Sequence, residues 1–139
     1  ARSMVAQMVR SGGQSQFSPV LGRQLQDGVG RFDRLHEWIF ENLEQELSVE
    51  ALASQANMSP RNFARVYGKS MGLTPAKAVE AMRIERAQEL LASTDKPLKQ
   101  IAVTCGFKEE ERMRRAFVRV RNVTPSDYRQ IFRIPATEA

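Results

Sequence analysis

LSVEALASQANMSPRNFARVYGKSMGLTPAKAV, residues 47–79, is echoed about fifty residues later by KPLKQIAVTCGFKEEERMRRAFVRVRNVTPSDYR, residues 96–129. The offset between matched residues is 49 before the turn and 50 after it, as one residue inserted near Lys108 would produce. The matched positions are Leu52 with Ile101, Ala53 with Ala102, Met58 with Phe107, Arg65 with Arg115, Tyr67 with Phe117, and Leu73-Thr74-Pro75 with Val123-Thr124-Pro125. A repeat of this kind indicates that one supersecondary unit occurs twice in the chain.

Both copies carry helix signals and no strand pattern. Ser59-Pro60 joins an N-cap hydroxyl to a proline at the first helical position, and Gly72 ends that helix. Thr74-Pro75 repeats the start signal for a long central helix. The expected helices span residues 32–47, 48–56, 59–71, 75–92, 97–106, 109–120 and 125–132. The sequence therefore predicts an all-α fold of about seven helices, with two helix-turn-helix subdomains joined by a long central helix.

The helix expected over residues 32–47 is amphipathic, and Trp38 should anchor its apolar face in the core. His36 lies on this helix beside the acidic Asp33 and Glu37, so we expect it at the surface without a chemical role.

Composition divides the chain into four parts. Residues 1–10 hold a short apolar stripe and are interpreted as the remnant of a preceding domain. Residues 11–31, rich in Gly, Gln and Ser, are interpreted as a linker. Residues 32–93 form the first predicted subdomain with the central helix, and residues 94–134 form the second.

The overall charge favours a polyanionic partner, because 21 Lys and Arg outweigh 16 acidic residues. A single cysteine, Cys105, excludes an internal disulfide, and with one histidine it cannot make an ordinary protein-only zinc site. We therefore expect no metal and no cofactor. No apolar run approaches the roughly 20 residues that span a bilayer, and no signal peptide is visible, so we expect a cytoplasmic protein without a membrane partner.

The second helix of the first copy presents a basic face. Arg61, Arg65 and Lys69 are spaced by four, and no acidic residue lies between Ser59 and Gly72. An arginine at a helix start can donate two hydrogen bonds to guanine, and a small side chain can touch a thymine methyl group. The predicted DNA contacts are Ser59, Arg61, Asn62, Ala64, Arg65 and Lys69, of which Arg61, Ala64 and Arg65 are expected to touch bases.

The second copy differs, because three glutamates at 109–111 precede its arginines. Acidic residues at a helix start suit the helix dipole, which is one explanation. Alternatively, a glutamate there accepts a hydrogen bond from cytosine, although it also repels phosphate. The predicted contacts of this copy are Glu110, Glu111, Arg112, Arg115 and Arg119.

A central helix over residues 75–92 would be about 27 Å long, whereas major grooves on one DNA face repeat every 34 Å or so. Two reading helices can then occupy adjacent grooves if the DNA bends, or only the first copy enters a groove.

The sequence gives no support for catalysis. Consecutive glutamates point about 100° apart on a helix, so Glu109 to Glu111 cannot act on one site together. Cys105 matches a small core residue of the first copy and is expected to be buried. We therefore expect no enzyme. One alternative is a protein-interaction module that docks its basic helices on an acidic partner, such as a polymerase subunit. A second alternative, an alkyl-accepting repair protein, would need reactive cysteines.

Several short motifs keep a characteristic order and spacing. They are Ile101-Ala102, Cys105-Gly106-Phe107, Arg115-Ala116-Phe117, Val123-Thr124-Pro125 and Tyr128-Arg129. With these motifs, residues 32–132 resemble the AraC/XylS family of bacterial transcription regulators. The resemblance implies two helix-turn-helix subdomains that bind double-stranded DNA as an activator or a repressor, with RNA polymerase as a further partner. Glu109 to Glu111 and Asn122 depart from the family, where Ser or Gln and Gly are usual.

Residues 12–17, GGQSQF, and 113–117, MRRAF, are similar to the GlxA-type subgroup of this family. That similarity implies a preceding amidotransferase-like sensor domain of the PfpI type, of which residues 1–10 would be the final helix. A small-molecule effector would then act only through this sensor, which this chain does not include.

Overall fold

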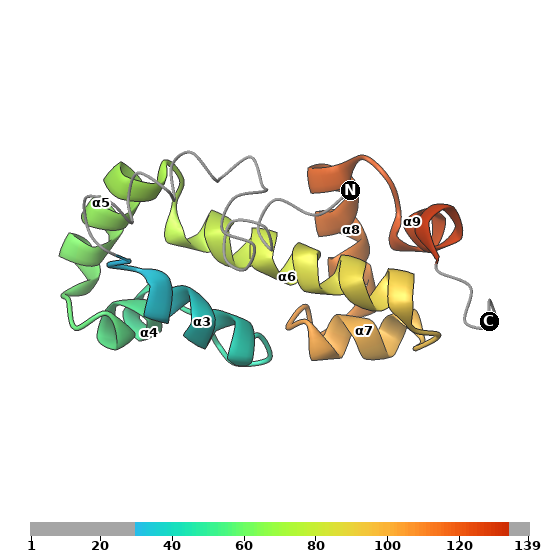
Figure 1. The fold of residues 1–139 in the computed structure, drawn as a ribbon, viewed down its shortest axis with the longest axis horizontal. Helices are drawn as coiled ribbons and strands as arrows, with labels where there is room; N and C mark the ends of the chain where they lie inside the picture. The colour runs from blue at the N-terminus through green and yellow to red at the C-terminus, as the bar shows by residue number, and fades with distance from the viewer. Residues whose placement is uncertain (1–29, 134–139) are drawn as a thin grey trace. The chain divides into compact units, whose positions relative to one another are not determined.

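A computed structural model describes residues 30–133, which form seven α-helices and no β-strand (Figure 1). The predicted all-helical class is therefore confirmed. Residues 1–29, which include the predicted remnant and most of the predicted linker, lie outside the described residues. The helices are α3 (Asp33–Glu41), α4 (Val49–Gln55), α5 (Pro60–Met71), α6 (Pro75–Ser93), α7 (Leu98–Thr104), α8 (Glu110–Arg121) and α9 (Pro125–Phe132).

The ends of α5 follow from local capping chemistry. The Ser59 hydroxyl accepts a hydrogen bond from the backbone N–H of Asn62 at 3.2 Å, and Pro60 stands in the first turn. Gly72 ends the helix with a φ of 80°, a left-handed conformation that costs most other residues about 1–2 kcal/mol. The predicted start and end of this helix are confirmed.

The turn between the two helices of each copy contains the same backbone hydrogen bond. The N–H of Met58 donates to the carbonyl of Ala53 at 2.9 Å, and the N–H of Phe107 donates to the carbonyl of Ala102 at 2.8 Å. Both donors and both acceptors are matched positions of the sequence repeat. The two copies therefore form the same structural unit.

The turns also show where the repeat changes its offset. Asn57 and Gly106, which match in the repeat, both have a positive φ, at 59° and 91°. The second turn has a further residue with positive φ, Lys108 at 75°, and the first turn has no counterpart to it. The predicted insertion near this position is confirmed.

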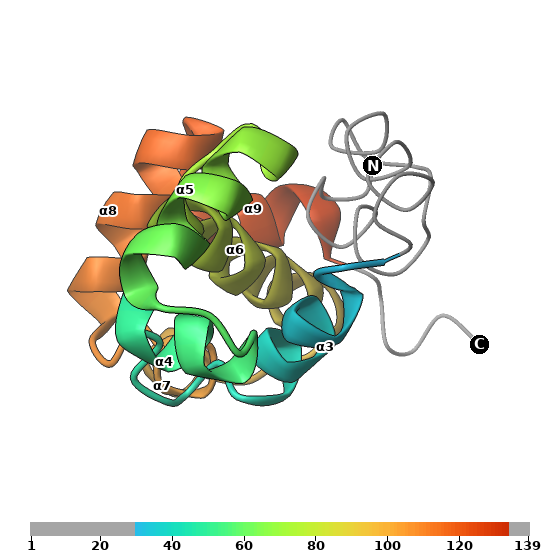
Figure 2. The same cartoon turned by 90° about the vertical axis from the view of Figure 1, so that its left-hand side faces the viewer.

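Two compact units make up the described residues, and the division falls inside α6 between Met82 and Arg83. The first unit holds α3, α4, α5 and the start of α6, and the second holds the rest of α6 with α7, α8 and α9. Within the first unit α4 packs on α5, and the two lie side by side in both views (Figures 1 and 2). Within the second unit α7 packs on α8, and α8 packs on α9.

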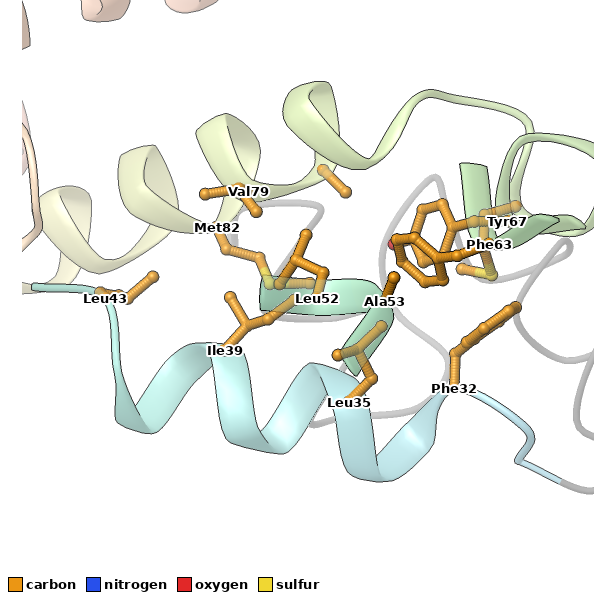
Figure 3. Packing of buried hydrophobic residues seen from close by; sticks show 12 residues of the cluster. Phe32, Leu35, Ile39, Leu43, Leu52, Ala53, Phe63, Tyr67, Val79 and Met82 are labelled. Atoms are coloured by element: carbon orange, nitrogen blue, oxygen red, sulfur yellow. The ribbon is translucent and has the colours of Figure 1, made fainter. Parts of the chain in front are cut away.

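The core of the first unit joins all of its helices (Figure 3). Leu35 and Ile39 of α3 point toward Leu52 of α4, and Met82 of α6 approaches the same place from the other side. These four side chains are almost completely buried. Each such burial stabilises the fold by about 1.5–3 kcal/mol. The same cluster includes Phe63, Tyr67 and Met71 of α5, so this core holds α5 on its supporting helices.

α3 is shorter than predicted, because it ends at Glu41 and not near residue 47. The side-chain amide of Asn42 donates to the carbonyl of Trp38 at 2.8 Å, in place of the backbone N–H that would continue the helix. Leu43 is still buried and joins the core from beyond the helix end. Trp38 packs against the edge of the core and is only partly buried.

In the second unit, polar side chains tie the helices together. Arg121 Nε donates to Gln88 Oε1 at 2.9 Å, and Gln88 Nε2 donates to the hydroxyl of Tyr128 at 3.0 Å. Cys105 is completely buried in the hydrophobic core of this unit, as predicted.

Arg129 closes the end of α6. Its guanidinium donates to the carbonyl of Leu91 at 3.1 Å and to the carbonyl of Thr94 at 3.0 Å. These are the acceptors that a helix leaves unpaired at its C-terminal end. Between residues 30 and 133, no helix is both long and apolar enough to cross a lipid bilayer.

Candidate nucleic-acid interface

α5 has a buried face and an exposed face. Phe63 and Tyr67 are no more than 1% exposed, whereas Arg61, Arg65 and Lys69 lie at the surface. Residues four apart drift by only about 40° around a helix, so the three basic side chains share one face, opposite the core. The predicted contacts Ser59 and Asn62 are also exposed, and Ala64 is partly buried. Their contact with DNA stays a prediction.

The Arg65 guanidinium is held near the start of α5. Its Nη2 donates to Asn62 Oδ1 at 2.6 Å, one turn toward the N-terminus. Side chains at this end of the second helix are the ones that reach base edges in helix-turn-helix proteins. Because a guanidinium has five N–H donors, this bond leaves donors for a second partner.

The charge of α5 is entirely positive. Its twelve residues include three basic side chains and no acidic one. The unpaired N–H groups of its first turn add partial positive charge at the same end. The exposed face of α5 can therefore approach a phosphate backbone without any opposing charge of its own.

α8 carries more arginines, but its own glutamate neutralises some of them. The Glu111 carboxylate accepts from Arg114 at 3.0 and 2.6 Å and from Arg115 at 3.2 Å. The hydrogen bond from Arg114, followed by the one from Arg115, lowers the pKa of Glu111 to about 2, so this carboxylate is ionised at neutral pH. The predicted contacts left out Arg114, although its spacing of three residues from Glu111 is one at which helical side chains pair.

The other predicted contacts on α8 are exposed as well. Arg112 lies 3.9 Å from the carboxylate of Glu109, and both side chains are about two-thirds exposed. Glu110 and Arg119 also lie at the surface. The arrangement gives α8 a mixed outer face, in contrast to the purely basic face of α5.

His36 is buried, so its predicted surface position was wrong. It is 1% exposed, and its Nε2 forms a hydrogen bond of 2.8 Å with the hydroxyl of Tyr67 on α5. Burial lowers the pKa of His36 to about 4 and raises the pKa of Tyr67. The imidazole is therefore neutral at physiological pH.

A sequence signal for this burial existed. His36 falls on the stripe formed by Phe32, Leu35 and Ile39, at the spacing that faces a core. The neighbouring acids, Asp33 and Glu37, lie on the exposed side of the same helix and suggested the opposite placement. The helical periodicity therefore indicates the burial of His36 correctly, whereas the polar residue type and the acidic neighbours do not.

The chemistry that the described residues offer is recognition of an anion. Across residues 30–133, no three His, Cys, Asp or Glu side chains come together as a possible metal site. The groups that gather on α5 are guanidinium, ammonium and amide donors, which suit phosphates and the acceptor edges of bases.

Comparison with known families and structures supports the same arrangement. A family model described as a helix-turn-helix domain matches residues 52–131, which span both modules. The HTH-type transcriptional regulator Rv1931c of Mycobacterium tuberculosis is 42% identical over 81 residues, 58% of this chain and 31% of that protein. The chain spans less than half the length of the first curated relatives that it matches.

Solved structures share the fold. The C-terminal domain of AraT, a response regulator from Geobacillus stearothermophilus, gives a TM-score of 0.72 at 27% identity, covering 79% of this chain and 92% of that one. The DNA-binding domain of the global transcriptional factor AdpA, solved in complex with a target DNA, gives 0.70 at 29% identity, covering 78% and 98%. With a family match over more than half of its residues, the chain belongs to the AraC-type helix-turn-helix family of DNA-binding transcription regulators.

Proposed function

We propose that this chain binds specific sequences of double-stranded DNA, with the exposed face of α5 in a major groove. The observation that carries the proposal is the exposed, acid-free basic face of α5, mounted on a buried aromatic face. Arg61, Ala64 and Arg65 would contact bases, while Ser59, Asn62 and Lys69 would position the helix or contact phosphates. A bacterial regulator of this kind acts in the cytoplasm, without a cofactor.

α8 would enter a second, adjacent groove through Glu110, Glu111, Arg112, Arg115 and Arg119. We expect its contribution to be smaller, because Glu111 shares two of the arginines and repels phosphate. α6 has 19 residues and is about 28 Å long, less than the roughly 34 Å between grooves on one DNA face. DNA that contacts both helices would therefore bend.

The full-length protein would join this DNA-binding part, residues 32–93 and 94–134, to a sensor. We propose that residues 1–10 are the end of an amidotransferase-like domain of the GlxA-type subgroup, and that residues 11–31 link it to α3. A small effector would bind the sensor, and RNA polymerase would be the partner at the promoter.

Selection from a random duplex pool tests the proposed function. The chain should enrich one sequence element, and its affinity for that element should fall steeply between 50 and 200 mM salt, because several phosphates are neutralised. If the chain enriched no element, or if its affinity did not change with salt concentration, the proposal of sequence-specific DNA binding would be contradicted. If duplex DNA failed to displace an acidic protein from α5, the protein-interaction alternative would be favoured instead.

A further inference from the structure

A buried polar contact connects α3 to the unexposed face of α5. His36 Nε2 and the Tyr67 hydroxyl lie 2.8 Å apart, and both residues are 1% exposed. The two rings meet edge to face, with centroids 5.8 Å apart. Neither residue lies on the exposed face of α5 or α8.

The surroundings of this contact are aromatic. The ring of Tyr67 lies 5.0 Å from that of Phe32 and 5.4 Å from that of Phe63, measured between centroids. Figure 3 shows these three rings gathered at one end of the core. Aromatic pairs prefer edge-to-face or offset arrangements, but they allow centroid separations from about 4.5 to 7 Å, whereas a hydrogen bond holds its donor and acceptor within a few tenths of an ångström. The His36 contact is therefore the most restrictive contact of this interface.

The rotation of α5 about its axis matters for DNA contact, because the basic face lies on the opposite side of this helix from Tyr67. Arg65 precedes Tyr67 by two residues, so a rotation of α5 about its axis moves both side chains. A rotation of about 20° moves an atom 6 Å from the axis by about 2 Å. That displacement exceeds the tolerance of a base contact, whose donor and acceptor must lie about 2.7–3.2 Å apart.

We propose that His36 is a positioning residue for DNA reading, which sets the rotation of α5 through Tyr67 and thereby the base preference of Arg65. The proposal rests on the proposed function. His36 lies in the core on the far side of α5 from the basic face, and it acts without touching DNA. Its loss should reduce discrimination between bases more than it reduces attraction to DNA as such.

Three variants and one matched control separate positioning from packing. Tyr67→Phe removes only the hydroxyl. The double variant His36→Leu/Tyr67→Phe replaces both polar partners by apolar groups, which is often nearly neutral for stability. His36→Gln keeps a polar nitrogen or oxygen that can reach the hydroxyl of Tyr67, and it is the rescue. Tyr128→Phe makes the same chemical change in the second unit and is the matched control.

The readout is the ratio of affinities for the selected element and for the same duplex changed at the base pair that Arg65 reads. Circular dichroism confirms that each variant is folded at the temperature used. We expect Tyr67→Phe and the double variant to lower this ratio by about tenfold, with affinity for random duplex changed less than threefold. His36→Gln and Tyr128→Phe should keep the ratio within about threefold of the parent chain.

A double variant that is stable and still discriminates like the parent chain would overturn the proposal, because packing alone would then orient α5. Equal losses on selected and random duplex would overturn it too. If the parent chain itself prefers no sequence, the proposed function fails and this inference fails with it.

Discussion

α5 and α8 have the same scaffold but different outer faces. Both have twelve residues, and both end at a residue with left-handed backbone, Gly72 at a φ of 80° and Asn122 at 62°. At the start of α5 the Ser59 side chain accepts a hydrogen bond from the helix backbone. At the start of α8 the N-cap residue is Glu109, and its side chain makes no such bond. α5 has no acidic residue, whereas Glu111 of α8 and the N-cap residue Glu109 pair with arginines of that helix. The turn and the core fix the scaffold and leave the surface free to diverge.

The buried polar contacts of the two units also differ. Tyr67 of the first unit matches Phe117 of the second, so the second unit cannot repeat the contact with His36. Arg121 of the second unit, which contacts Gln88, matches the apolar Met71 of the first. Each unit thus connects its second helix to a neighbouring helix through a polar contact at a position that is apolar in the other unit.

The largest expected effect concerns the independence of the two cores. Phe63→Ala in the first unit and Phe117→Ala in the second should each lower the free energy of unfolding by about 3–5 kcal/mol, because both rings are completely buried. Amide hydrogen exchange should show each loss mainly in its own unit, α4 and α5 or α7 and α8. Equal loss of protection in both units would mean that they unfold as one.

The next largest effect is a pH dependence of stability that is expected in the first unit, which contains His36. Between about pH 6.5 and pH 4 the unfolded chain binds a proton at His36 that the folded chain excludes, since burial lowers the folded pKa to about 4. Stability should therefore fall by up to about 3 kcal/mol as the pH falls through this window, first in α3 and α5, which His36 connects. His36→Gln should flatten this part of the curve, and an unchanged curve would contradict the burial of the imidazole.

Matched arginine substitutions compare the two reading faces. Arg65→Ala should weaken binding to the selected element by about 1–3 kcal/mol and relax preference at one base pair. Arg115→Ala, the matched change in the second copy, should cost less, because Arg115 must leave Glu111 to contact DNA. Affinities for a set of duplexes with single base-pair changes measure both. A larger loss from Arg115→Ala would reverse the proposed order of the two helices.

The smallest effect concerns the acid on α8. Glu111→Gln should release Arg114 and Arg115 and raise affinity a few-fold on every duplex, with a salt slope steeper by about 1 to 2. A salt titration of the variant and the parent chain measures the difference. A loss of affinity restricted to elements with one particular base pair would instead indicate that Glu111 reads cytosine.

Much of the fold could be predicted from local signals in the sequence. Ser59-Pro60 and Thr124-Pro125 specify helix starts through backbone chemistry that depends on few neighbours, and the structure has helices at both places. The inserted residue at Lys108 followed from the change in offset alone. These features need no knowledge of tertiary packing.

The errors arose where one particular side-chain contact decides the outcome. The apolar residues beyond Glu41 continued a helical pattern, but the amide of Asn42 ends the helix. The helical periodicity places His36 on the buried face, but its hydrogen-bond partner Tyr67 is thirty-one residues away, and no local pattern contains that partner. The pairing of Glu111 with Arg114 depends on side-chain orientation, which spacing alone leaves open.

A tethered cleavage experiment tests most directly whether α5 lies in the groove of the selected element. Cys105→Ala, the residue that the first copy has at the matched position, gives a chain without cysteine to which Lys69→Cys on α5 or Glu37→Cys on α3 is added. A DNA-cutting reagent attached at position 69 should cut within the selected element, next to the base pair read by Arg65, while the same reagent at position 37 should cut little. Equal cutting from both positions, or none from position 69, would contradict the assignment of α5 as the reading helix.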